Sequence, residues 1–158
     1  MSLEKLKKKI NLPKKASNNT LNNFRNKLNI DKPKNFKKNS LSINQAVTNQ
    51  PYEPDILDLY NLYNFIILNK RTTILEFGSG WSSLVMSIAL YENKIKFNED
   101  IKKLRRNNPF ELFIIDNEKK FLKISKNRIN NFSKNNKIDT KIHWHHSEIE
   151  MTTYMGRI

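Results

Sequence analysis

Residues 72–83 have the sequence TTILEFGSGWSS, which limits the architectures open to this chain. The first six residues are mostly β-branched or apolar, as in a strand that is buried on both faces. Gly78 and Gly80 then allow a sharp turn and leave no Cβ in the way of a ligand. Residues 81–91 have the apolar spacing of a helix. A strand, a Gly-rich turn and a helix N-terminus in this order predict a ligand-binding edge.

The remaining segments alternate in the same way. Apolar residues predict a helix over residues 55–69, with Asp55 as its N-cap. Further strands are predicted at residues 110–116 and 139–145, with a helix at residues 118–132 between them. Repeated β-α-β units imply a parallel sheet with right-handed crossovers. We therefore expect an α/β fold whose polar side chains gather at the carboxyl ends of the strands.

Residues 1–50 form a predicted basic extension, separate from a domain at residues 51–158. The extension holds 12 Lys or Arg residues against two acidic residues, and so carries most of the formal net charge of +14. Such an arm could bind nucleic acid. We favour the alternative of a solvated, partly disordered extension, because Lys and Asn are frequent throughout the chain and only Phe24 and Phe36 could stack on bases. A short helix is predicted around residues 21–28.

The composition excludes several classes of protein. The chain has no cysteine, so it has neither disulfides nor thiolate metal sites. No apolar run approaches the roughly 20 residues that span a bilayer. Residues 1–10 lack the apolar core of a secretory signal. We therefore expect a cytoplasmic protein without a membrane span.

Residues 75–80, Leu-Glu-Phe-Gly-Ser-Gly, resemble the first motif of class I S-adenosylmethionine-dependent methyltransferases, an acidic residue followed by x-Gly-x-Gly. The resemblance implies a Rossmann-like, three-layer parallel sheet and S-adenosylmethionine as the cofactor. In that family the Gly-rich turn passes under the amino-acid part of the cofactor, so Glu76 would hold the turn and the methionine end. The sequence does not identify the methyl acceptor.

The resemblance covers residues 51–158 at most. A complete domain of that family has more strands than the three predicted here. The sheet is therefore expected to be incomplete. The chain would then be a truncated product, or the N-terminal fragment of a methyltransferase-like protein, and inactive alone.

The expected cofactor-binding residues all lie at or just after the ends of predicted strands. Asp116 ends the second strand, where its carboxylate could accept hydrogen bonds from both ribose hydroxyls. The alternative is a surface Asp that caps the helix beginning near Glu118. Gly-x-Gly also fits an ordinary strand-to-helix turn with a surface acid, and Asn117 fits an ordinary helix start. Ser147 and Glu148 follow the third strand, where members of the family often place a polar or acidic residue near the adenine amino group. The full set is Glu76, Phe77, Gly78, Ser79, Gly80, Asp116, Asn117, Ser147 and Glu148.

One spacing departs from a compact dinucleotide-binding unit. Gly80 and Asp116 are 36 positions apart in the sequence, against about 20 in that unit. We interpret the excess as an insertion at residues 93–109, which could either extend the preceding helix or form a loop.

Three other interpretations are less favoured. His143 and His145 share a strand face, but no carboxylate lies at a recognised ligand spacing from them, so we expect no metal. A dinucleotide fingerprint, Gly-x-Gly-x-x-Gly, would need glycine where Ser83 stands. The last alternative is a non-enzymatic basic nucleic-acid-binding or interaction protein on the same scaffold.

Overall fold

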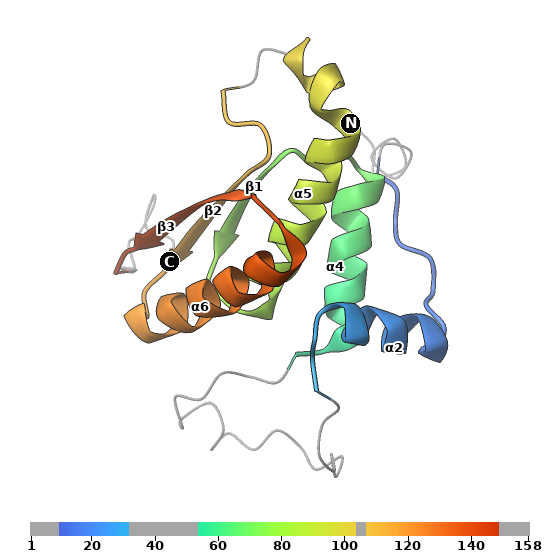
Figure 1. Cartoon of the computed structure of the whole chain (residues 1–158), viewed down its shortest axis with the longest axis horizontal. Coiled ribbons are helices and arrows are strands. Elements are labelled where there is room, and N and C mark those ends of the chain that lie inside the picture. The colour runs from blue at the N-terminus through green and yellow to red at the C-terminus, as the bar shows by residue number, and fades with distance from the viewer. Residues whose placement is uncertain (1–9, 32–53, 104–106, 149–158) are drawn as a thin grey trace, which may run out of the picture. The chain divides into compact units, whose positions relative to one another are not determined.

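The chain alternates helices and strands in the order that the sequence predicts (Figure 1). The computed structural model describes residues 10–31, 54–103 and 107–148. The chain divides into two units, residues 1–69 and residues 70–158. The predicted domain boundary at residues 50 and 51 lies outside the described residues.

The first unit contains helix α2 (Asn18–Lys27) and helix α4 (Ile56–Leu68). The helix predicted around residues 21–28 is thus confirmed, and so is the N-cap of α4. The carboxylate of Asp55 accepts hydrogen bonds from the backbone N–H groups of Leu57 and Asp58, at 2.8 and 3.1 Å. An N-cap of this kind satisfies backbone donors that have no partner within the helix.

Aromatic packing joins α2 to α4. The buried ring of Phe24 lies 5.4 Å, between ring centroids, from both Tyr60 and Tyr63. A pair of reciprocal hydrogen bonds links Asn11 to Asn69. Part of the predicted N-terminal extension is therefore ordered against α4, because the apolar face of α2 is buried there.

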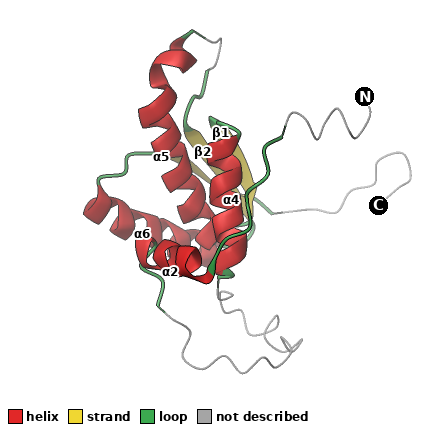
Figure 2. Cartoon of the chain, turned by 90° about the vertical axis from the view of Figure 1, so that its right-hand side faces the viewer, coloured by secondary structure: helices red, strands yellow, loops and turns green. Residues whose placement is uncertain are grey.

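The second unit is built on a parallel sheet with strand order β1-β2-β3. Its strands are β1 (Thr73–Phe77), β2 (Glu111–Asp116) and β3 (Lys141–His146). Helix α5 (Trp81–Lys102) joins β1 to β2, and helix α6 (Lys119–Asn136) joins β2 to β3, as the colouring along the chain in Figure 1 shows. Figure 2 distinguishes the helices, in red, from the strands, in yellow. The predicted α/β fold with a Rossmann-like, all-parallel sheet of three strands is confirmed.

One face of this sheet carries the core. Leu112 and Ile114 of β2 are fully buried and pack with Leu90 of α5, and Leu122 of α6 packs on the same cluster. Side chains alternate between faces along a strand, so the odd-numbered residues lie on the other face. There Leu75 of β1 is 55% exposed. The expectation that the first strand is buried on both faces is therefore wrong, because both helices of this unit cover the same face.

Helix α5 includes much of the predicted insertion, so of the two alternatives for residues 93–109 the structure favours the extended helix. It ends at Lys102 instead of near Tyr91. The buried side chain of Asn93 donates a hydrogen bond to the backbone carbonyl of Arg71, at 2.8 Å, and Ile101 is also buried. These two buried side chains stabilise the second half of α5, although most of its other residues are charged. Within the described ranges, no helix combines the length and the apolar character needed to cross a bilayer.

The two faces of the sheet provide a matched test of the core. Leu112 is fully buried and Leu75 is mostly exposed. We expect Leu112→Ala to lower the free energy of unfolding by about 2–5 kcal/mol, because it removes buried apolar surface and leaves a cavity. Leu75→Ala should cost less than about 1 kcal/mol. Urea denaturation measures both values, and equal losses would contradict the assignment of the faces.

Candidate functional site

The Gly-rich turn is held against the end of the neighbouring strand. The backbone N–H of Gly78 donates a hydrogen bond to the carbonyl of Ile115 in β2, at 2.7 Å. Gly78 has a φ of 85°, a conformation that a residue with a Cβ adopts only with strain. The turn that follows β1 is thereby placed beside the carboxyl end of β2, as the parallel sheet requires.

Glu76 is a buried acid that holds the start of α5. Its side chain lies on the covered face of the sheet, and the residue is only 7% exposed. The hydroxyl groups of Ser82 and Ser83 donate hydrogen bonds to its two carboxylate oxygens, at 2.5 and 2.6 Å. Ser83 Oγ also accepts a hydrogen bond from the backbone N–H of Gly80, at 3.1 Å. Glu76 is therefore not the surface acid of the alternative interpretation, and the cofactor role of the turn stays a prediction.

The environment of Glu76 favours its protonated form. Burial raises the pKa of this carboxyl above its ordinary value of 4.5, and the two serine hydroxyls oppose the rise. The nearby negative charge of Asp116 adds to the rise. Two acidic groups on adjacent strands thus face the same small region at the carboxyl end of the sheet.

Asp116 is held in place from two sides. The residue is 4% exposed, and the hydroxyl of Ser79 donates a hydrogen bond to Oδ2 at 2.6 Å. The backbone N–H of Glu118, at the start of α6, donates to Oδ1 at 2.8 Å. Asp116 therefore does make the helix-start contact considered as the alternative to ribose binding. The same carboxylate also contacts the Gly-rich turn, which a simple capping role would not require.

The other predicted site residues are less closely involved. Phe77 is 73% exposed and lies on the open face of the sheet. Asn117, Ser147 and Glu148 are exposed. The backbone N–H of Ser147 donates to the carbonyl of Asp116, at 3.1 Å, which keeps the end of β3 beside β2. The structure thus brings together Glu76, residues 78–80 and Asp116, while Phe77 lies on the other side.

The sequence analysis missed the roles of Ser82 and Ser83 as partners of Glu76. A signal was present, since two hydroxyl residues follow the acid by six and seven positions across a tight turn. The contact of Ser79 with Asp116 was also missed, because no local spacing links the turn after β1 to the end of β2.

The histidines of β3 form a different kind of cluster. Glu111 accepts hydrogen bonds from Lys141 at 2.9 Å and pairs with His143 Nε2 at 2.6 Å. These two contacts, that with Lys141 first, lower the pKa of the Glu111 carboxyl. The His143 ring stacks on Phe113 with centroids 4.3 Å apart. Among the described residues, no three His, Cys, Asp or Glu side chains are grouped so as to hold a metal ion.

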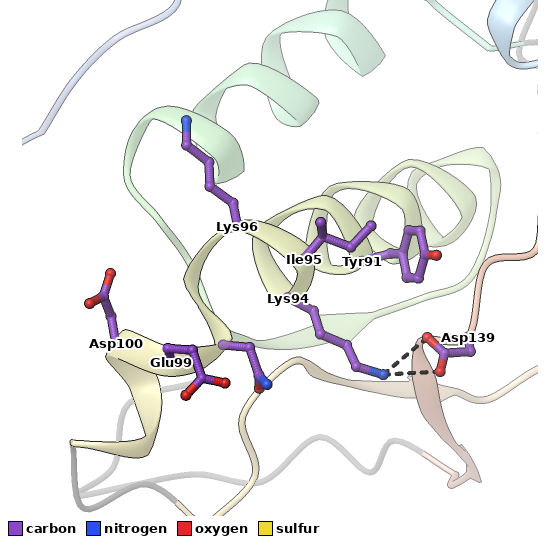
Figure 3. Close-up of a pocket in the computed structure, with 8 residues that line it drawn as sticks. Tyr91, Lys94, Ile95, Lys96, Glu99, Asp100 and Asp139 are labelled. Atoms are coloured by element: carbon purple, nitrogen blue, oxygen red, sulfur yellow. Dashed lines mark hydrogen bonds and ion pairs between the residues drawn. The ribbon is translucent and has the colours of Figure 1, made fainter.

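A cavity of about 460 Å³ lies elsewhere in this unit, along the second half of α5 (Figure 3). Most of its lining side chains are charged or polar, and Lys94 and Asp139 pair across it at 3.0 Å. Asp139 precedes β3, so the cavity lies at the opposite end of that strand from Ser147. Ligand pockets are usually lined by apolar groups, and this cavity is not part of the candidate site.

Comparisons of the chain with models of protein families, with curated proteins and with solved structures find no match. The resemblance to methyltransferases therefore depends on residues 75–80, and the role of each site residue stays a prediction.

Two buried serines of α5 allow a matched test of the Glu76 contacts. Ser83 donates to the buried carboxylate, whereas Ser87 donates to the backbone carbonyl of Leu84 within the helix. We expect Ser83→Ala to cost about 1–3 kcal/mol of unfolding free energy, because a buried acceptor loses its donor. Ser87→Ala should cost less than about 1 kcal/mol. Chemical denaturation of both variants gives the comparison, and an equal cost would mean that the contact with Glu76 contributes little.

The raised pKa of Glu76 also predicts a dependence of stability on pH. Between pH 4.5 and the pKa in the folded state, the folded chain binds more protons at Glu76 than the unfolded chain does. Stability from this group therefore falls as the pH rises through that window. Glu76→Gln cannot titrate, so the stability of the wild type relative to this variant should be greatest near pH 4 and should decrease toward pH 7. Urea denaturation at several pH values tests this, and a difference that grows with pH would contradict it.

Proposed function

We propose that this chain is a methyltransferase-like protein that binds S-adenosylmethionine at the turn formed by residues 78–80. The proposal assigns no methyl acceptor. The observation that carries the proposal is the meeting of this turn with the buried carboxylate of Asp116 at the carboxyl end of a parallel sheet. Parallel α/β sheets bind ligands at that end of their strands.

The chemistry of Asp116 suits a ribose. An ionised carboxylate has two oxygens and about four lone-pair sites, so it can accept hydrogen bonds from two neighbouring hydroxyls. Asp116 already binds one hydroxyl, that of Ser79. A ribose diol presents the same type of donor twice.

The surface of the turn allows a ligand to approach. A Cβ added at Gly78 would meet no heavy atom within 4 Å, and one added at Gly80 would meet only Ser82 Oγ, at 3.8 Å. The space over both glycines is therefore not filled by the chain. The methionine end of the cofactor would lie there, next to Glu76.

S-adenosylmethionine supplies an electrophilic methyl group on its sulfonium, which a substrate nucleophile displaces in line. The residues of this chain would bind and orient the cofactor, since positioning is the main contribution that such a reaction asks of a protein. The described residues of the second unit provide three strands, and the proposed site involves the residues that would bind the cofactor and none assigned to a methyl acceptor. We therefore propose cofactor binding, rather than turnover, as the activity to measure first.

Isothermal titration with S-adenosylhomocysteine tests the proposal. We expect saturable binding that Asp116→Ala weakens about tenfold or more, because hydrogen bonds to a charged acceptor are lost. Gly80→Val should also weaken binding, since its side chain would occupy the open space over the turn. Asp139→Ala is the matched control, because this carboxylate is exposed and pairs with Lys94.

Circular dichroism establishes that each variant is folded before it is titrated. Binding that Asp116→Ala and Asp139→Ala affect equally would place the ligand elsewhere. No heat from the folded wild type would overturn the proposal. The non-enzymatic alternative would then be tested by the salt dependence of nucleic-acid binding.

A further inference from the structure

Ser79 occupies a position where it competes with the proposed ligand. Its hydroxyl donates to Oδ2 of Asp116 at 2.6 Å, and the N–H of Glu118 donates to Oδ1 at 2.8 Å. Both oxygens of this buried carboxylate therefore have a partner within the chain. A ribose diol that reaches Asp116 must take the place of the Ser79 hydroxyl or share its oxygen.

We propose that Ser79 sets the affinity and the selectivity of the site by donating to Asp116 until a ligand diol replaces it. This inference rests on the proposed function, because it names the residue that regulates access to the same carboxylate. The backbone donor from Glu118 cannot leave without disturbing the start of α6. The serine hydroxyl is the one of the two partners that a ligand can displace at low cost.

The movement needed is small. Ser79 lies between two glycines, and a serine side chain turns about a single bond between three staggered positions. Rotation about that bond would release Asp116 while the Gly78 backbone keeps its hydrogen bond to Ile115, at 2.7 Å. The buried carboxylate would not be left without donors, since the incoming hydroxyls replace the serine.

The exchange has a consequence for selectivity. A ligand with a ribose diol gains its hydrogen bonds to Asp116 but loses the bond from Ser79. A ligand without the diol leaves Ser79 in place and gains nothing at this carboxylate. Removal of the Ser79 hydroxyl should therefore strengthen the binding of diol ligands alone.

The experiment titrates the full chain and its Ser79→Ala variant with S-adenosylhomocysteine and with the analogue that lacks both ribose hydroxyls. We expect Ser79→Ala to bind S-adenosylhomocysteine about tenfold more tightly than the wild type, the scale of one hydrogen bond to a charged acceptor. Its affinity for the dideoxy analogue should be unchanged. Ser79→Thr keeps the hydroxyl and should bind both ligands as the wild type does. Ser79→Cys, a weak donor of similar size, replaces the alanine variant if that variant does not fold.

The outcomes separate this inference from the proposed function. Tightening by Ser79→Ala that is confined to the diol ligand supports the inference. Equal tightening of both ligands, or no tightening while the wild type binds, overturns the inference and leaves the proposed function in place. Absence of binding by the folded wild type overturns both.

Discussion

The hydrogen bonds from Ser82 and Ser83 to the carboxylate of Glu76 are the interaction on which the site depends. A buried acid costs free energy unless donors surround it. Here both donors come from the first turn of α5, so the need to satisfy Glu76 fixes where that helix begins. The residues between strand and helix must then form a tight turn, which the positive φ of Gly78 allows. One buried carboxylate thus determines the end of β1, the shape of the turn and the direction of α5.

Asp116 extends the same arrangement to the neighbouring strand. The hydroxyl of Ser79 connects the turn to the tip of β2, and the N–H of Glu118 connects that tip to α6. Burial and the nearby charge of Asp116 both raise the pKa of Glu76, and the serine hydroxyls that donate to Glu76 oppose the rise. Arg128 of α6 lies over the ring of Trp81, 4.1 Å from its centroid, and so also fixes the first residue of α5 against α6. Among the described residues, hydroxyl and amide donors thus join Glu76, Asp116 and the Gly-rich turn into one polar network at the carboxyl end of the sheet.

Local pattern was enough to predict the strands, the helices, the parallel order and the cap at Asp55, because each depends on residues close in sequence. Strand ends shifted by one or two residues. Phe110, for example, has a φ of 61° and so lies outside β2. Local pattern left open whether residues 93–109 extend α5 or form a loop, because Asn93 is held by a contact with Arg71, 22 positions away in sequence. The pairing of Glu111 with His143 crosses from β2 to β3, and that of Ser79 with Asp116 joins the turn after β1 to the end of β2, so neither follows from spacing along the chain.

The two faces of the sheet separate the predicted site residues into two groups. Parallel sheets are normally covered on both faces, and in the second unit α5 and α6 cover only the face that carries Glu76 and Asp116. On that face polar groups are desolvated, so each hydrogen bond between them is stronger than in water. Phe77 points the other way and is 73% exposed. No buried hydrogen bond fixes the position of this ring. Buried hydrogen bonds do fix the positions of Glu76, the Gly-rich turn and Asp116.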